Sequence, residues 1–516
     1  MIPALLAVII AFSVMGTAIV EVTLTNFSVV GNIVRSQQAF NIAESGLNYY
    51  MWHLNHNATD YKDGQTTPAT PDPQLGYGPY THDYIDTNGV DEGTYTLWIN
   101  PAGNDSTIVN VRSIGQAAGT NIKRTVEAQI GSPSFASYAV ASDSALWFGN
   151  TESADGPVVS NQGVRMDGPS NSTVSSANAT YVPPYELGGD GSSHPGVWCS
   201  SSVTSPINCN TRSKSAWIYP VPQINFNQVA TAQCTMKKVA FAADSATASL
   251  ATQSNACSQT PSTRTSSYLP QRSKSYSLTR GYLILLNSNG TYDLYDVNGE
   301  NDQLTPYTSA LTLQSVATNV TIPSSGVIFA EDNVWVLSNP TYHGRVTISA
   351  GRLASSNSST YANVVIAGPL VYSTKNGADA VGLVAQNSVI LAPYAPPSGG
   401  SFNFEIDGAL LAENGEVWYP GSYRTNNYRC TRGWTNSNQQ FLFYGSVATR
   451  QTWTWTWLDG GYPCGDAAYD PANGYISGIE NNTTQYDYNL LYTPPPSYPV
   501  TSGYNILSWR EILTRP

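Results

Sequence analysis

The first twenty residues of the chain carry no charged side chain. As a helix, the stretch MIPALLAVIIAFSVMGTAIV would be about 30 Å long, enough to cross the hydrocarbon core of a bilayer. Glu21 is the first charged residue and Arg35 is the first cation. Secretory signals and ordinary membrane anchors normally carry basic residues beside the apolar run. Because none precedes this one, we expect that a basic leader has been removed ahead of Met1.

The helical pattern continues beyond the apolar run. Between Ala39 and Leu54, apolar side chains recur every three or four residues, which is typical of one buried helix face. This stripe consists of Ala39, Ile42, Leu47, Tyr50, Met51 and Leu54. The sequence therefore predicts one helix over residues 1–54, about 80 Å long if unbroken. Gly16, Gly31 and the β-branched stretch 19–34 lower helix propensity and would permit local unwinding.

The stretch AFNIAESGL, residues Ala39–Leu47, resembles the Ala-Phe-x-x-Ala-Glu-x-Gly-Leu pattern of PilX-like type IV pilins and related large prepilin-type proteins. The resemblance implies a structural subunit of an extracellular type IV pilus-like filament on the cell surface. A prepilin peptidase would cleave its leader, and the pilus assembly machinery would draw the subunit from the inner membrane. Its partners would be copies of itself or other pilins, which contact it through the N-terminal helix. Met1 would be the new N-terminus, and Glu44, next to Ala43, is the carboxylate of the motif.

Position five departs from the family pattern. Most pilins carry Glu there, thought to pair with a neighbour's terminal amine, whereas this chain has Leu5. Glu21 lies about 24 Å further along the helix, so only an axially shifted neighbour could bring Met1 to it. In the alternative interpretation Glu21 marks the end of the uncharged run of residues 1–20. A plain transmembrane anchor followed by a stalk would have the same length and apolarity.

The composition of the whole chain favours a secreted protein. Only 11% of the residues are charged, against roughly 25% in an average soluble domain. The net charge is −12 and no basic run exceeds Lys237-Lys238, so we expect no nucleic-acid partner. The six cysteines fall into three sequence-local pairs, which we interpret as disulfides of an oxidising compartment rather than zinc ligands. The predicted disulfides are Cys199–Cys209, Cys234–Cys257 and Cys430–Cys464.

Residues 55–133 are predicted to form a second region. It begins with an irregular loop to about residue 90, dense in Pro, Gly, Asn and Asp. Alternating segments then predict strands at Gly93–Ile99, Ser106–Ser113 and Arg124–Ile130. They are similar to the small antiparallel sheet that pilins pack on their helix.

Residues 134–516 are predicted to form a large β ectodomain. From Gly326 to Pro420, short runs of Val, Ile and Leu alternate with polar corners and no helical period intervenes. This texture favours a parallel β-solenoid (β-helix), because a β-sandwich would need Asn-Gly or Asp-Gly hairpin turns that are scarce here. A looser, disulfide-bearing insertion is expected at about residues 190–275. The predicted fold class is therefore α+β, mostly β: a long hydrophobic helix, a small pilin-like sheet and a β-solenoid.

We expect that the chain is not an enzyme and that it binds no cofactor or metal. Polysaccharide-cleaving β-helices need carboxylates that converge in one groove, but the candidates here are scattered, and hydrolase and nucleotide-binding motifs are absent. The candidate carboxylates are Asp155, Asp167, Glu331, Asp332 and Glu405. The stretch Asp296–Asp302, DVNGEND, offers oxygen ligands for calcium, although a hairpin turn explains the same residues and is preferred.

The stretch Thr452–Trp457 predicts a strand with three tryptophans on one face, Trp453, Trp455 and Trp457. If exposed, this face could bind surface glycans or a neighbouring subunit; if buried, it would pack on the solenoid. Two alternatives to the shaft-subunit role therefore stay open. The chain could be a minor or tip pilin that acts as an adhesin, or a membrane-anchored carbohydrate-active β-helix protein.

Overall fold

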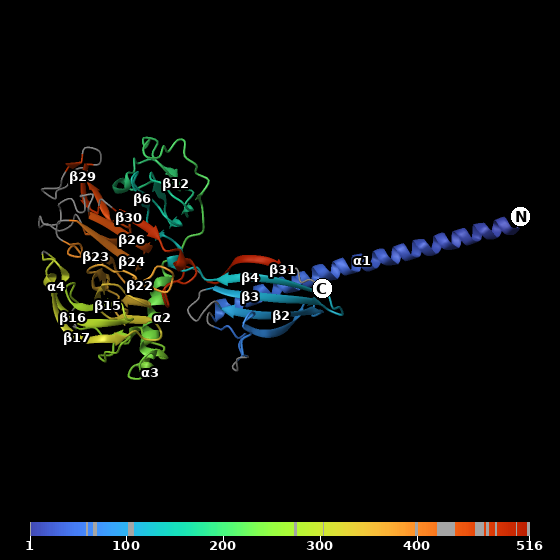
Figure 1. Ribbon diagram of the computed structural model, residues 1–516, viewed down its shortest axis with the longest axis horizontal. Coiled ribbons are helices and arrows are strands. Elements are labelled where there is room, and N and C mark those ends of the chain that lie inside the picture. Colours follow the sequence, from blue (N-terminus) through green and yellow to red (C-terminus); the bar gives the residue numbers. More distant parts are fainter. Residues whose placement is uncertain are drawn as a thin grey trace. The chain divides into compact units, whose positions relative to one another are not determined.

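The computed structural model describes residues 2–57, 60–65, 70–101, 108–272, 276–302, 304–397, 401–420, 439–459, 469–470, 474–479, 482–501 and 503–512. The chain is mostly β, with one long N-terminal helix and several sheets (Figure 1). It divides into a first unit, Met1–Ser132 with Gly503–Pro516, and a second unit, Pro133–Ser502. The boundary near residue 133 lies where the sequence predicted it. The C-terminal segment, which was expected to belong to the ectodomain, instead joins the first unit.

Helix α1, Ile2–His56, is continuous over its 55 residues, as predicted for residues 1–54. The local unwinding that Gly16 and Gly31 would permit does not occur. Each glycine costs about 1 kcal/mol relative to alanine, and this is too little to break a long, cooperatively formed helix.

The first unit contains one antiparallel five-stranded sheet in the order β1-β2-β3-β4-β31. Strands β2 to β4 are the three predicted strands. Strand β1 lies in the stretch that was predicted to be a loop, because Gly and Pro within it obscured the alternation. The strands are β1 (Tyr77–Ile85), β2 (Asp91–Pro101), β3 (Ile108–Ala117), β4 (Lys123–Gly131) and β31 (Asn505–Ile512).

The second unit contains an eleven-stranded sheet in the order β13-β9-β7-β5-β26-β24-β22-β20-β18-β14, with β30 also paired to β26. All of its pairs are parallel. The strands are β5 (Val140–Ser142), β7 (Val158–Ser160), β9 (Val174–Ser176), β13 (Trp217–Ile218), β14 (Tyr268–Leu269), β18 (Val327–Ala330), β20 (Arg345–Ala350), β22 (Ala380–Ala385), β24 (Phe402–Ala412), β26 (Gln439–Thr449) and β30 (Asn482–Tyr486).

A seven-stranded sheet in the order β17-β16-β15-β19-β21-β23-β25 forms a second layer. Its strands from β15 to β25 pair in parallel, whereas β15, β16 and β17 are joined as antiparallel neighbours. The strands are β15 (Gly281–Asn287), β16 (Thr291–Glu300), β17 (Leu311–Thr321), β19 (Asn333–Asn339), β21 (Val364–Ile366), β23 (Val389–Leu391) and β25 (Val417–Trp418).

Successive strands from β18 to β26 alternate between these two sheets. Each strand pairs in parallel with the strand two places further along the chain, which is not the hairpin pairing of a β-sandwich. The parallel pairing predicted for residues 326–420 is therefore present, while the parallel β-solenoid itself stays a prediction. A third parallel sheet contains β6 (Leu146–Phe148), β8 (Val164–Met166) and β12 (Val197–Trp198).

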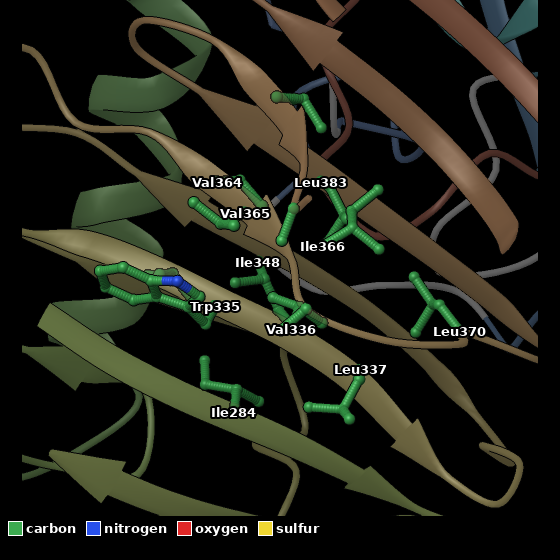
Figure 2. Close-up of a cluster of buried hydrophobic side chains, with 14 of the residues drawn as sticks. Ile284, Trp335, Val336, Leu337, Ile348, Val364, Val365, Ile366, Leu370 and Leu383 are labelled. Atoms are coloured by element: carbon green, nitrogen blue, oxygen red, sulfur yellow. The ribbon is translucent and has the colours of Figure 1, made fainter. Parts of the chain in front are cut away.

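A continuous apolar core lies between the layers of the second unit. Figure 2 shows Trp335, Val336 and Leu337 of β19 with Ile348 of β20 and Leu383 of β22 in this core. Neighbouring strands of a layer present side chains at the same register, so apolar residues stack along each sheet. This arrangement explains why the segments in residues 326–420 consist of short Val, Ile and Leu runs.

Part of the insertion at residues 190–275, expected to be loop, is ordered as helix α2, Gln228–Ala242. Val229, Met236, Ala240 and Phe241 of this helix are buried with residues of the eleven-stranded sheet, including Phe329 and Val384. Its sequence, QVATAQCTMKKVAFA, has small residues on the apolar face, so the helical period was weak. The remaining short strands and α-helices of the described residues are β10 (Thr180–Tyr181), β11 (His194–Pro195), α3 (Ala248–Ala251), α4 (Tyr307–Ala310), β27 (Thr456–Asp459), β28 (Tyr469–Asp470) and β29 (Gly474–Gly478).

Two local predictions need correction. Of the stretch Asp296–Asp302, residues Asp296–Glu300 are not a turn but the end of β16, and only Asn301 and Asp302 lie in the connection to the antiparallel strand β17. The stretch Thr452–Trp457 is not one strand, because Thr454 forms an isolated bridge with Trp418 and β27 begins only at Thr456.

Candidate assembly and binding surfaces

The N-terminal part of α1 presents apolar side chains to solvent on all sides. Leu5 is 67% exposed and Phe27 is 71% exposed, and residues 2–34 are exposed throughout. This is the one helix among the described residues that is long and apolar enough to cross a membrane. A helix that is apolar all round needs lipid or other helices around it. Exposed apolar side chains continue along α1 to Val34, with Glu21 as the one charged residue among them. Residues 2–34 of α1, here called the apolar segment, are therefore the first candidate surface.

The three threonine hydroxyl groups in the apolar segment are bonded within the helix. Thr17, Thr23 and Thr25 each donate to a backbone carbonyl four residues earlier, at 3.1, 2.7 and 2.8 Å. Because these donors are satisfied without water, the three threonines tolerate apolar surroundings. Glu21 is exposed and its carboxylate contacts no side chain among the described residues.

The motif stretch Ala39–Leu47 packs against the first-unit sheet. A side chain at Gly115 of β3 would meet the carbonyl oxygen of Ala39 and the backbone nitrogen of Ala43. A side chain at Gly46 would meet Ser113 and the ring of Tyr95, whose Cδ2 would lie 2.8 Å away. The small residues of the motif therefore allow close approach of helix and sheet. Glu44 lies beside this contact and is half-buried.

Polar contacts fix the C-terminal half of α1 to the same unit. Tyr50 donates to the Asp60 carbonyl at 2.8 Å, and Asn55 exchanges two hydrogen bonds with the backbone of Tyr504, at 2.8 and 3.0 Å. Arg124 of β4 donates to Ser36 at 2.8 Å and also pairs with Glu511 of β31. The C-terminal strand thus helps to hold α1 on its sheet.

Trp453 and Trp455 of the stretch Thr452–Trp457 do not form an exposed face. Trp455 is only 5% exposed, and its ring lies 5.5 Å from Phe441 and 5.9 Å from Trp453. Trp453 is half-buried and lies 6.0 Å from Phe148. The binding-face alternative is therefore wrong for Trp455, because this side chain fills the core. The Trp457 side chain lies outside the described residues.

The structure pairs Cys199 with Cys209 and Cys234 with Cys257, as predicted. Their Cα atoms are 5.9 and 5.2 Å apart, within the range of disulfides. The predicted pair Cys430–Cys464 lies outside the described residues.

The carboxylates singled out from the sequence do not converge, and each has a local partner. Asp167 is buried, accepts from Arg165 at 2.7 Å and from Trp147 at 2.9 Å. Glu331 and Lys237 form a fully buried ion pair in which burial lowers the pKa of the lysine. The other partners are Tyr486 for Asp155, Asn333 for Asp332 and Lys375 for Glu405.

The proposed calcium ligand Asp296 is held by Arg264 at 3.0 Å and Arg272 at 3.3 Å. Because two arginines already neutralise this carboxylate, it offers no net negative charge to a calcium ion. The described residues contain no group of three or more His, Cys, Asp or Glu side chains placed to hold a metal ion.

Sequence reasoning missed an open cleft of about 490 Å³ in the second unit. It lies between β11–β12 and β13, where two of the parallel sheets end. The lining residues are His194, Pro195, Val197, Trp198, Cys199, Lys214, Trp217 and Tyr219. In the sequence, the cluster of Trp198, Trp217 and Tyr219 near Cys199 is the feature that could have predicted this cleft.

No family model matches the chain, and no curated protein matches it. Among solved structures, the chain is similar to the competence-associated pilin ComZ from Thermus thermophilus. The two share 13% sequence identity, and the match covers 93% of this chain and 98% of that one with a TM-score of 0.28. A score this low carries no argument about fold or function, so the inferences below depend on the residues of this chain.

Proposed function

We propose that this chain is a structural subunit of an extracellular type IV pilus-like filament and polymerises through α1. The observation that carries the proposal is the distance over which exposed apolar side chains continue along α1, from Ile2 to Val34. The 33 residues of this apolar segment extend about 50 Å, whereas the hydrocarbon core of a bilayer is about 30 Å thick. A plain membrane anchor would leave exposed apolar residues such as Phe27 and Ile33 in water. Helices of neighbouring subunits would cover the whole segment.

The remaining features support this role. The AFNIAESGL stretch resembles PilX-like pilins and places its small residues at the contact between helix and sheet. Disulfides suit an oxidising extracellular space, and the alternating parallel strands support a β-solenoid ectodomain. Before assembly, α1 would be inserted in the inner membrane and a prepilin peptidase would remove the leader. A role in assembly requires no catalysis, and we propose none.

A lysine at position 27 separates the filament role from a plain anchor. Residue 27 lies about 39 Å along the helix from residue 1, beyond the hydrocarbon core. A plain anchor would therefore tolerate Phe27→Lys. In a packed bundle of helices, the same change would bury an unpaired charge at a cost of several kcal/mol per subunit. We expect Phe27→Lys to remain in the membrane fraction and to abolish filaments, measured by shearing and electron microscopy.

Asn48→Lys is the matched control, because Asn48 is an exposed polar residue of the same helix and the change adds the same charge. It should assemble at the wild-type level. Wild-type filament yield from Phe27→Lys would contradict the proposal.

A second role, that of a minor or tip pilin acting as an adhesin, is favoured by the aromatic cleft of the second unit. Sheared filaments that contain this chain only in traces would favour that role over the filament shaft.

A further inference from the structure

The cleft between β11–β12 and β13 has rigid walls. The rings of His194 and Trp198 are stacked with centroids 3.6 Å apart, and the Trp198 indole donates to the Tyr181 hydroxyl at 3.0 Å. The disulfide Cys199–Cys209 holds the next turn of chain. Because these side chains are fixed before any ligand arrives, little conformational entropy would be lost on binding.

Two aromatic residues that line the cleft are accessible to solvent. Tyr219 is 38% exposed and Trp217 is half-buried. The Trp217 ring is supported by the Arg212 guanidinium, 4.8 Å from its centroid, and Arg212 donates to the Gly168 carbonyl at 2.7 Å. An amphipathic ring held in place at an open site offers a flat apolar platform with polar groups beside it.

Lys214 supplies the exposed charge of this site, since the Arg212 guanidinium is bonded to the carbonyls of Met166 and Gly168. Its ammonium group lies 5.5 Å from the centroid of the Trp217 ring, and Lys214 is exposed and forms no ion pair with any described residue. The nearby Asp190 carboxylate is engaged by His194 at 3.0 Å and by the Ser192 amide at 2.8 Å. In a chain with net charge −12, an unpaired cation beside an aromatic platform is complementary to an anionic ligand.

We propose that this cleft binds an acidic saccharide. The apolar face of a sugar ring would pack on Trp217 and Tyr219, and its carboxylate would lie at the Lys214 ammonium group. The site goes beyond the proposed filament role, because none of its residues belongs to α1. A peptide strand is a poorer fit, because β12 and β13 are two residues long and offer little backbone for strand addition.

The test uses the full chain in detergent micelles and two probes, tri-galacturonic acid and the neutral galactotriose. Isothermal titration calorimetry should detect binding of the acidic probe and at least tenfold weaker binding of the neutral one. Trp217→Ala and Tyr219→Ala should each weaken binding of the acidic probe at least tenfold. Lys214→Gln should abolish the preference for the acidic probe. Lys123→Gln, an exposed lysine of the first unit, is the matched control and should change nothing.

Circular dichroism and the intact Cys199–Cys209 bond would show that each variant is folded. Tyr219→Ala keeps the test valid if Trp217→Ala is misfolded, because Tyr219 is exposed. Absence of binding by the wild-type chain, or binding that survives Trp217→Ala and Tyr219→Ala, would overturn the proposal. Equal binding of both probes would overturn the acidic specificity. Filament yield from Lys214→Gln is measured separately, so failure of this site is distinguishable from failure of assembly.

Discussion

Burial raises the pKa of Glu413 to about 7, from an ordinary value of 4.5, because the side chain is only 8% exposed. The folded protein therefore holds this proton between about pH 4.5 and 7, where the unfolded chain has lost it. Its contribution to stability is greatest below pH 4.5 and falls as the pH rises to 7. At pH 8, ionised Glu413 costs the folded state roughly 3 kcal/mol, because each unit between the two pKa values corresponds to about 1.4 kcal/mol.

We expect Glu413→Gln to raise the free energy of unfolding at pH 8 by about this amount, because the amide has nearly the same shape without the charge. At pH 4.5 the variant and the wild type should be equally stable within about 0.5 kcal/mol. Urea unfolding at the two pH values measures both quantities. A stability difference that does not depend on pH would show that the carboxyl is not the titrating group.

Gly115 decides how closely α1 approaches its sheet, since a side chain there would collide with the helix backbone at Ala39 and Ala43. We expect Gly115→Ala to lower the free energy of unfolding of the first unit by about 1 to 3 kcal/mol through overpacking. Gly299→Ala is the control, because the nearest atom to its new methyl group would be 3.6 Å away. Equal effects of the two changes would contradict the close contact. Thermal unfolding followed by circular dichroism would report them.

Helix α2 packs its buried face into the core of the second unit and is not a surface loop. Phe241 is fully buried, and its ring lies 4.7 Å from that of Tyr268. We expect Phe241→Ala to cost about 3 to 5 kcal/mol in denaturant unfolding, because the cavity would lie between helix and sheet. Thr235→Ala, at an exposed position of the same helix, should change stability by less than about 0.5 kcal/mol. A similarly small effect at Phe241 would mean that α2 is detached in solution.

At the scale of the whole molecule, the chain leaves the first unit at Ser132 and returns to it at Gly503. Strand β31 then pairs with β4 along Asn505–Ile512. Removing residues 503–516 would expose the β4 edge and delete the Tyr504 backbone bonds to Asn55. We expect this deletion to destabilise the first unit by on the order of 5 kcal/mol and to leave the second unit unchanged.

Limited proteolysis would measure this effect, with cleavage in residues 60–131 separated from cleavage in the second unit by mass spectrometry. Arg510→Ala is the control, because its ion pair with Glu127 at 2.7 Å is largely exposed on the arginine side and contributes little. Unchanged protection of the first unit after the deletion would show that β31 is dispensable.

The sequence by itself determined the elements whose signal is local. The uncharged run and the stripe from Ala39 to Leu54 predicted one long helix, because a 3.6-residue period needs no knowledge of partners. Alternation predicted β2 to β4, and short apolar runs predicted parallel strands over residues 326–420. Proximity along the chain predicted the pairs Cys199–Cys209 and Cys234–Cys257.

Only the tertiary structure decided which segments meet across long separations. It placed β31 beside β4, buried Trp455 in the core and turned residues 228–242 into a helix that covers a sheet. It also gathered His194, Lys214 and Trp217 around one cleft. In each case the deciding free energy comes from burial against residues remote in sequence, which a local period or spacing does not contain.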